Sequence, residues 1–464
     1  MSLCDVGLIG LAVMGENLAK NFARNLFKVA IYNRTGEVTR RLMAENSSLT
    51  KQMVACYDLK ELVGQLKTPR KIIIMVKAGD ALDRVIEQLL PYLTREDIII
   101  DGGNSYYRDT NRRFKFLYDK SIHYVGMGVS GGEKGALLGP SLMPGGLEKV
   151  VMQLLPMLKK VAAQHPVPCV YYMGGEGAGH FVKMVHNGIE YAEMQIIAEV
   201  YDIFRKIFDY DNEKIASIFK DYQTSDLNSY LLGITIKILQ RKDDQLDLYL
   251  VDLILDEAQG KGTGKWTIME SLEYGSPVPS IYGAYCARNI SAHRLLRKQI
   301  SSLYNKKIIP KIPSVNLLDI VKDAMRASKI LAYTQGLNLI VEASQINKWK
   351  TNLTDVISSW CDGCIIRCAM LDPMITALGE NSNLLLTREF SGILKESIIP
   401  LKQTLFLGLE AGVATPAMSG AAWYFEYFSE TVMPTNLIQA QRDYFGAHTY
   451  RRTDRDGIFH TVWE

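Results

Sequence analysis

The chain has 464 residues, of which 47% are hydrophobic and 22% charged, and its formal net charge is +3. This length allows roughly two to four globular domains, and so small a net charge excludes nucleic acid or a membrane surface as a partner held by bulk charge. The longest apolar runs, such as residues 72–76, fall far short of the ~18 residues of a membrane span.

Up to about residue 175, short β-branched runs alternate with amphipathic helical stretches. Strands recurring with helices between them imply a parallel sheet with right-handed crossovers. The sequence therefore predicts an α/β, Rossmann-like domain over residues 1–177. Its strands are expected at residues 4–10, 29–32, 72–76, 98–100 and 123–125.

A glycine-dense stretch at residues 173–179 ends this pattern, and we expect it to act as a hinge. Beyond it helical periodicity takes over. The sequence predicts a large all-α domain over residues 178–432, followed by a C-terminal tail over 433–464 without strong periodicity. The expected helices lie near residues 180–208, 213–223, 227–240, 247–258, 315–345, 352–372 and 384–413.

Three of the seven cysteines, Cys361, Cys364 and Cys368, are spaced like ligands of a metal or cluster. They would share one face of the helix expected at 352–372, among apolar neighbours. No fourth ligand is evident, and free cysteine usually behaves as a small buried hydrophobe, so we expect core packing and no metal. The odd number of cysteines favours free thiols. With no basic segment at the N-terminus and no lipidation tag at the C-terminus, we expect a cytoplasmic protein.

A glycine-rich run follows the first expected strand and opens a helix. It reads as a dinucleotide fingerprint, Gly10-x-Ala12-x-x-Gly15, whose middle glycine has become alanine. Small residues there let the backbone approach a pyrophosphate, whose charge meets the helix N-terminus. The alternative is an ordinary tight turn, but the position after strand one favours a nucleotide. The expected cofactor-binding residues here are Gly10, Leu11, Ala12, Val13, Met14 and Gly15.

The residues that follow the second expected strand indicate which nucleotide is bound. Enzymes that use NAD usually place Asp or Glu there to hold the ribose 2′-hydroxyl. Here the strand is followed by Asn33, Arg34 and Thr35, with no carboxylate to repel a 2′-phosphate and an arginine to bind one. An exposed turn arginine is the alternative. After the fingerprint, the sequence favours NADP.

The stretch KMVHNGIEY, residues 183–191, carries five polar chemistries on one side of a helix. Lys183, His186, Asn187, Glu190 and Tyr191 fall within roughly one 140° sector at 100° per residue. A polar stripe is usually a solvated face. However, His, Asn and Tyr are directional hydrogen-bonding groups, and the helix starts where two domains should meet. Binding sites prefer such interfaces, so we expect the stripe to face a substrate.

Several motifs together resemble those of the decarboxylating 6-phosphogluconate dehydrogenase family, essentially from end to end. The resemblance implies that NADP oxidises 6-phosphogluconate to ribulose 5-phosphate and carbon dioxide without a metal. The matching segments are residues 7–15, 33–35, 129–132, 139–146, 183–191, 261–266 and 442–448.

The resemblance also implies residue roles. Lys183 matches the family's base, which takes the C3 hydroxyl proton, and Glu190 matches the acid that, after carbon dioxide leaves, protonates the carbon that becomes C1 of the product. A lysine can be a base only if desolvation or nearby cations lower its pKa. The family match makes Val76, Lys77 and Ala78 a cofactor-contacting loop and assigns Asn104 to the cofactor and substrate. Its other implied substrate ligands are Ser130, Gly131, Gly132, His186, Asn187, Tyr191, Lys261, Thr263 and Arg288.

The tail carries the last implied ligands, Arg442 and His448. In the family this tail reaches the active site of the other subunit. The resemblance therefore implies an obligate homodimer whose site is completed in trans.

Two positions depart from the family pattern. The order Gln259-Gly260 reverses the usual Gly-Gln, which could alter a helix C-cap there, and Cys361 replaces a basic residue. Two other functions compete. A β-hydroxyacid dehydrogenase shares the front loop and the lysine but is about 300 residues long, and a non-catalytic NADP-binding sensor would not need paired acid and base.

Overall fold

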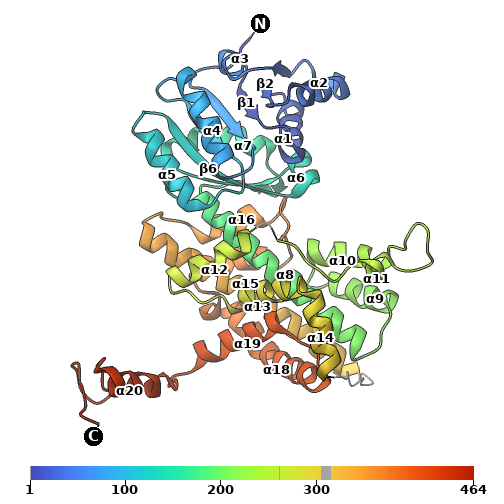
Figure 1. Ribbon diagram of the computed structural model, residues 1–464, viewed down its shortest axis with the longest axis vertical. Helices are drawn as coiled ribbons and strands as arrows, with labels where there is room; N and C mark the ends of the chain where they lie inside the picture. The colour runs from blue at the N-terminus through green and yellow to red at the C-terminus, as the bar shows by residue number, and fades with distance from the viewer. Residues whose placement is uncertain (1, 261, 305–314, 464) are drawn as a thin grey trace.

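The computed structural model describes residues 2–260, 262–304 and 315–463, and it has an α/β part followed by a helical part (Figure 1). The α/β part is built on a seven-stranded sheet in the order β3-β2-β1-β4-β5-β6-β7, parallel throughout except for the antiparallel pair β6–β7. Its strands are β1 (Val6–Ile9), β2 (Val29–Tyr32), β3 (Met53–Cys56), β4 (Lys71–Ile74), β5 (Ile98–Asp101), β6 (His123–Ser130) and β7 (Ser141–Gly145).

Helices cover both faces of this sheet, and each face has its own apolar cluster. Phe22 of α1 and Leu154 of α7 belong to one cluster, and Leu62 of α3 and Ile86 of α4 belong to the other. A sheet buried on both faces reads as continuous apolar strands, as 29–32 and 98–100 do. The helices are α1 (Val13–Arg24), α2 (Gly36–Glu45), α3 (Leu59–Gly64), α4 (Asp80–Leu89), α5 (Tyr107–Tyr118), α6 (Gly132–Leu138) and α7 (Glu148–Val161).

The expected α/β and all-α classes are confirmed, but two strands of the seven-stranded sheet were missed. β3 is a short run that sequence analysis passed over. β7 contains Pro144 and Gly145, residue types that are rare in strands. β7 is tolerated because it lies at the edge of the sheet, where a proline breaks fewer ladder hydrogen bonds. A further two-stranded ladder joins β8 (Gln164–His165) to β9 (Val167–Pro168).

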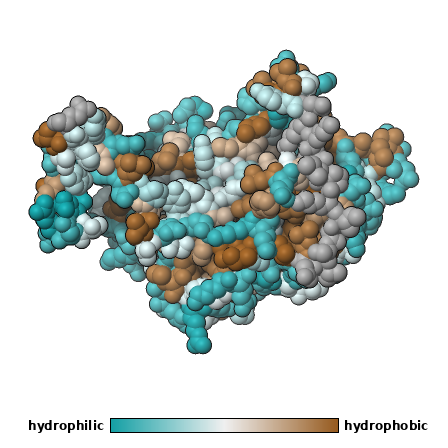
Figure 2. Space-filling view, turned by 90° about the horizontal axis from the view of Figure 1, so that it is seen from below, coloured by the Kyte–Doolittle hydropathy of each residue, from teal (hydrophilic) through white to brown (hydrophobic). Residues whose placement is uncertain are grey.

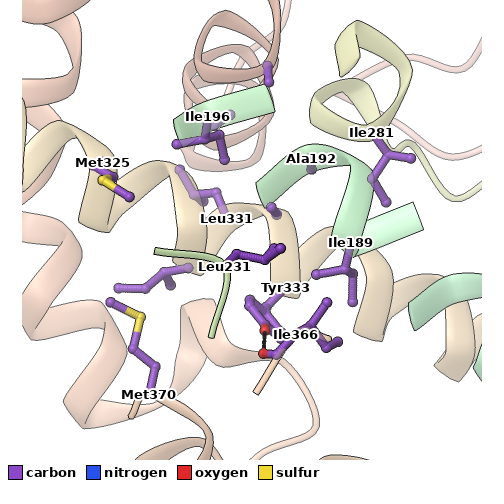
Figure 3. Close-up of a cluster of buried hydrophobic side chains, with 14 of the residues drawn as sticks. Ile189, Ala192, Ile196, Leu231, Ile281, Met325, Leu331, Tyr333, Ile366 and Met370 are labelled. Atoms are coloured by element: carbon purple, nitrogen blue, oxygen red, sulfur yellow. Dashed lines mark hydrogen bonds between the residues drawn. The ribbon is translucent and has the colours of Figure 1, made fainter. Parts of the chain in front are cut away.

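The helical part is organised around two long helices, α8 and α15. Ile189, Ala192 and Ile196 of α8 pack beside Leu331 and Tyr333 of α15 (Figure 3). The helices are α8 (Ala178–Lys206), α9 (Asn212–Gln223), α10 (Tyr230–Gln240), α11 (Leu250–Leu253), α12 (Thr263–Glu273), α13 (Pro279–Ser291), α14 (Arg294–Tyr304), α15 (Val315–Asn347), α16 (Leu353–Trp360), α17 (Leu371–Glu380), α18 (Arg388–Ala411), α19 (Pro416–Ser429) and α20 (Thr435–Gly446).

Several helix predictions were wrong. The helix expected at 247–258 is only the single turn α11, and the tail contains an unpredicted helix, α20. The helix expected at 352–372 breaks after Trp360, because Gly363 (φ +67°) turns the chain toward the sheet and accepts a hydrogen bond from the Ser141 N–H (3.0 Å). α12, α13, α14, α17 and α19 were not predicted.

The three cysteines of this region therefore do not share one helix face. Cys361 and Cys364 are buried and Cys368 is half-buried in the turn between α16 and α17, and all are free thiols. Burial raises the pKa of the Cys368 thiol. Within residues 2–260, 262–304 and 315–463, no group of three or more His, Cys, Asp or Glu is arranged to hold a metal ion.

The glycine-dense segment before α8 is a close-packed seam, and its action as a hinge stays a prediction. A Cβ on Gly179 would lie 2.2 Å from the Gly126 oxygen, and one on Gly145 would lie 2.3 Å from the Gly179 nitrogen. The Gly177 N–H also donates to Asn111 Oδ1 (2.7 Å). The first turn of α8 is thus embedded, backbone against backbone, in β6 and β7. None of the helices that the structure describes is long and apolar enough to cross a bilayer.

Candidate active site

The loop between β1 and α1 has the geometry of a phosphate cradle. Gly10 adopts φ +94°, and a Cβ there would lie 2.5 Å from the Met75 oxygen. A Cβ on Gly15 would lie 1.9 Å from the Gly10 oxygen, so both positions require glycine. Ala12 is the N-cap of α1 and supplies no side-chain cap. The first N–H groups of α1 are therefore available to an anion at the positive end of the helix dipole.

The residues after β2 lie beside this cradle. Asn33 Oδ1 accepts a hydrogen bond from the Leu11 N–H (3.1 Å), which ties the loop to the end of β2. Arg34 and Thr35 are exposed beside it. The carboxylate nearest in sequence, Glu37, is paired with Arg40 (2.7 Å). The local residues therefore fit a dinucleotide with a 2′-phosphate. Val76, Lys77 and Ala78 follow β4, the neighbour of β1.

A cavity of about 370 Å³ lies where the α/β part meets the helical part. It is bounded by the first turn of α1, the segment after β5, the end of β6 and the turn after it, one face of α8, the segment before α12, α12, α13 and the turn between α16 and α17. Its lining residues are Met14, Asn104, Val129, Ser130, Gly131, Gly132, Lys183, Asn187, Glu190, Tyr191, Met194, Gln259, Gly260, Thr263, Arg288 and Ile365.

Most of the predicted substrate residues thus meet in one cavity, together with Met14 of the cofactor loop. Sequence analysis missed Val129, Met194 and Ile365, because apolar wall residues carry no chemical signature; Gln259 and Gly260 were noted only as a departure. Lys261 lies outside the described residues. Arg442 and His448 do not line the cavity; they are exposed in the tail, which projects away from the rest of the chain in Figure 1.

The polar stripe on α8 is buried and not a solvated face. Lys183, His186, Asn187 and Tyr191 are all buried, and Glu190 is partly exposed at the cavity wall. A Cβ on Gly128 of β6 would lie 2.4 Å from the Lys183 Cβ, so the strand presses directly on the lysine stem.

Burial lowers the pKa of Lys183 to about 8, although Glu190 and the Cys364 thiol act in the opposite direction. Desolvation disfavours the ammonium form, and a neutral amine can accept a proton. Lys183 is therefore poised to act as a base near neutral pH.

His186 links the lysine to the turn after β6. Lys183 Nζ lies 3.3 Å from His186 Nδ1, and Ser130 Oγ lies 3.2 Å from His186 Nε2. Burial and the Lys183 charge lower the pKa of His186 well below its usual value, so the ring is neutral. When the Lys183 ammonium donates to Nδ1, the imidazole proton is on Nε2 and can be donated to Ser130 Oγ.

Arg288 brings a cationic side chain to the cavity beside Tyr191. The Arg288 guanidinium stacks on the Tyr191 ring, with its Cζ 3.6 Å from the ring centroid. Gly260 and Gly264 make room for that ring, since a Cβ on either would lie 2.7 Å or less from a Tyr191 atom. Arg288 also donates to the Gln259 oxygen (3.3 Å).

The order Gln259-Gly260 does not change a helix C-cap as expected, because α11 has already ended at Leu253. Gly260 instead lies against the Tyr191 hydroxyl. The replacement at Cys361 has no structural explanation beyond its burial.

A Rossmann-like sheet with a phosphate cradle, joined to a helical part that brings a buried lysine of lowered pKa to the same cleft, defines a nucleotide-dependent dehydrogenase. Two family models match nearly the whole chain: the NAD binding domain of 6-phosphogluconate dehydrogenase over residues 5–174, and the 6-phosphogluconate dehydrogenase C-terminal domain over residues 179–463. The chain belongs to the 6-phosphogluconate dehydrogenase family.

Individual members of the family are similar to this chain over nearly their full length. The chain is 46% identical to the decarboxylating 6-phosphogluconate dehydrogenase of Synechocystis sp., covering 98% of this chain and 97% of that one. It is 44% identical to the NADP(+)-dependent, decarboxylating enzyme of Bacillus subtilis, with both chains covered completely. The Plasmodium falciparum 6-phosphogluconate dehydrogenase, solved in apo form, with its cofactor NADP+ and with its substrate 6-phosphogluconate, superposes with a TM-score of 0.96 at 43% identity, over 99% of this chain and 100% of that one.

Proposed function

We propose that this chain oxidises and decarboxylates 6-phosphogluconate to ribulose 5-phosphate and carbon dioxide, reducing NADP. The observation that carries this proposal is the cavity in which a buried Lys183 of lowered pKa and the Glu190 carboxyl share one helix face. Family membership and full-length similarity to NADP-dependent decarboxylating enzymes support the same reaction. A shorter β-hydroxyacid dehydrogenase would not match the C-terminal family model over residues 179–463.

The first step needs a base at the C3 hydroxyl of the sugar acid. Neutral Lys183 takes that proton, and bound NADP supplies the hydride acceptor. The resulting ammonium then polarises the new C3 ketone, which makes the C1 carboxylate that of a β-keto acid. His186 Nδ1 lies 3.3 Å from Lys183 Nζ and orients the amine. Because the imidazole is neutral, it adds no second positive charge beside the ammonium.

The second step breaks the C1–C2 bond, and its electrons move toward the C3 ketone. An enediol remains, and it needs a proton at the former C2, the carbon that becomes C1 of ribulose 5-phosphate. Glu190 lies on the same face of α8, about two turns beyond Lys183, and we assign it as the donor. Separate residues therefore serve the oxidation and the final protonation.

The remaining cavity residues divide by chemistry into two ends. Ser130, Asn187 and Asn104 offer neutral hydrogen-bonding groups near Lys183 and suit the carboxylate and hydroxyl end. Arg288 and Tyr191, with Thr263 nearby, suit the phosphate end, because a guanidinium binds phosphate oxygens strongly. Lys261, by its place in the family motif, is proposed to join this end.

For the cofactor, the cradle of Gly10 and Gly15 would hold the pyrophosphate of NADP, and Asn33, Arg34 and Thr35 would hold its 2′-phosphate. Val76, Lys77 and Ala78 are proposed to contact the rest of the nucleotide, as the family resemblance implies. Only Met14 and Asn104 of the predicted cofactor residues also line the substrate cavity.

We further propose a homodimer in which Arg442 and His448 of one chain complete the substrate cavity of the other. Both residues are exposed on a tail that projects from its own chain (Figure 1). Figure 2 shows apolar patches on the face of the helical part that points away from the sheet. Phe406 and Leu409 of α18 and Phe428 of α19 are among the exposed apolar side chains, and such surface favours association. A cytoplasmic location agrees with the free thiols of all seven cysteines.

In the decisive experiment, 6-phosphogluconate is supplied as substrate, and the carbon dioxide and NADPH that form are measured together. We expect the two products to appear in equal amounts. NADPH without carbon dioxide would support the hydroxyacid alternative, and no NADPH at all would support a non-catalytic binding protein. The three-part division at residues 177 and 432 stays a prediction, which limited proteolysis between the parts can check.

A further inference from the structure

The C-terminal tail folds around one buried carboxylate, Asp443 of α20. Its side chain is completely buried although its neighbours Arg442 and Tyr444 are exposed. Asp443 Oδ1 accepts hydrogen bonds from the Thr449 N–H (2.9 Å) and from His460 Nδ1 (2.9 Å). Oδ2 accepts from the Thr461 N–H and the Trp463 Nε1–H, both at 3.0 Å. All four donors come from the tail itself.

These contacts close a loop that brings residues 449–463 back against α20. The backbone pair Tyr450–Phe459 adds two hydrogen bonds of 2.8 Å inside the loop, and Gln439 of α20 donates to the Thr449 oxygen. Burial by itself would raise the pKa of the Asp443 carboxyl, but the bonds from His460, Thr461 and Trp463 outweigh it and hold the pKa at about 2. The group is therefore a pure acceptor at neutral pH.

The backbone next to this carboxylate is strained at His448. Ala447 (φ +50°) and Thr449 (φ +61°), on either side of the histidine, both adopt left-handed conformations that non-glycine residues rarely enter. Such conformations persist only where surrounding contacts impose them. Here the contact is the Thr449 N–H bond to Asp443. Gly446 makes room for the His448 ring, because a Cβ there would lie 2.7 Å from His448 Nε2.

Side chains at this end of the tail thus point in two directions. Asp443 faces inward and is saturated with donors, whereas Arg442, one residue earlier on α20, and His448, just after α20 ends, face outward. A flexible tail would lose conformational entropy when it binds substrate, and that loss weakens affinity. A tail folded in advance would not.

We propose that Asp443 is a positioning residue that prefolds the tail so that Arg442 and His448 reach the phosphorylated substrate in fixed geometry. This inference rests on the proposed function, in which those two residues complete the substrate cavity of a second chain. It adds a residue that touches neither substrate nor cofactor but sets how tightly the substrate is held.

The test compares Asp443→Asn with Asp454→Asn in the full-length protein. Asn keeps one acceptor oxygen but places an NH2 group against N–H donors, so some of the hydrogen bonds that the Asp443 carboxylate accepts are lost. Asp454 is a matched control, because it is an exposed tail carboxylate bonded only to Arg452 within the described contacts. We expect Asp443→Asn to raise KM for 6-phosphogluconate about tenfold, equivalent to about 1.4 kcal/mol, with KM for NADP unchanged. Asp454→Asn should match the parent in both.

Hydrogen exchange of the tail amides supplies the readout that separates positioning from a general loss of stability. The Thr449 and Thr461 amides should lose protection in Asp443→Asn and keep it in Asp454→Asn, with exchange elsewhere unchanged. A second variant, Gly446→Ala, should raise KM for 6-phosphogluconate while both amides stay protected, since it moves only the His448 ring.

The outcomes are distinguishable. If Arg442→Ala and His448→Ala leave KM for 6-phosphogluconate unchanged, the tail has no role in substrate binding and the proposed trans site fails. If those variants raise KM but Asp443→Asn does not, or if Asp443→Asn frees the two amides without changing KM, the positioning role of Asp443 is refuted and the trans site stands.

Discussion

Replacement of Lys183 and variation of pH test the same physical cause, the desolvation of one amine. With the pKa of Lys183 at about 8, the neutral fraction of the free enzyme is about one half at pH 8 and about one tenth at pH 7. Since kcat/KM reports groups of the free enzyme, we expect it to fall about tenfold for each pH unit below about pH 8. This fall in kcat/KM, the acid limb of the pH profile, can be measured from initial rates of NADPH formation at limiting 6-phosphogluconate.

Lys183→Arg is the matched variant, because arginine keeps the charge and much of the length but cannot lose its proton in this range. Removal of a general base typically lowers the rate by about 10²–10⁴-fold, and the remaining activity of Lys183→Arg should lack the limb near pH 8. A flat profile of the parent enzyme between about pH 6 and about pH 9, or near-normal turnover by Lys183→Arg, would refute the reasoning.

The same desolvation opposes folding, which gives an independent readout. The folded-state pKa of Lys183 lies below its unfolded value of 10.5, so the unfolded chain binds the proton more tightly. That penalty is fully present below about pH 8 and disappears toward about pH 10.5. Lys183→Met should therefore raise the free energy of unfolding by up to about 3 kcal/mol at neutral pH and lose this advantage in alkali. A destabilised Lys183→Met protein at neutral pH would contradict the burial argument.

Three further changes test other parts of the cleft. Gly128→Ala places a Cβ against the Lys183 stem, so the free energy of unfolding should fall by about 1–3 kcal/mol. Because the Cβ displaces the lysine, kcat should also fall, while NADP binding, followed by fluorescence titration, stays the same. Arg34→Ala should weaken NADP by about 1.5–3 kcal/mol and leave NAD nearly unaffected; equal losses for both would exclude a 2′-phosphate contact. Truncation after Asn436 should abolish turnover but preserve NADP binding by calorimetry, and full activity of the shortened chain would exclude a role for the tail.

The parts of the fold that sequence predicted correctly are those where local pattern and tertiary environment agree. β2 was predicted with its observed bounds, 29–32, because a strand buried on both faces leaves an uninterrupted apolar run. α8 and α15 were predicted because long periodic segments carry strong signals. β7 could not be found locally, since its proline is acceptable only at a sheet edge, and the break after Trp360 depends on Gly363 contacting the distant Ser141.

The candidate site, like the fold, has features that local sequence predicted and features that depend on distant contacts. The polar face of α8 is local information, and its five side chains were identified from spacing alone. What makes Lys183 a base is not local, because its lowered pKa comes from burial against β6, more than fifty residues earlier in the chain. The wall residues Met194 and Ile365 carry no chemical signature of their own. Arg442 and His448 were predicted to complete the site, yet they do not line the cavity of their own chain, and their contribution in trans stays a proposal.

The glycine seam at the start of α8 has a consequence for how the cleft operates. Gly126, Gly145 and Gly179 bring three backbone segments so close that no side chain fits between them. Close backbone packing of this kind opposes movement of the first turn of α8 against β6, the strand that also contacts the Lys183 stem at Gly128.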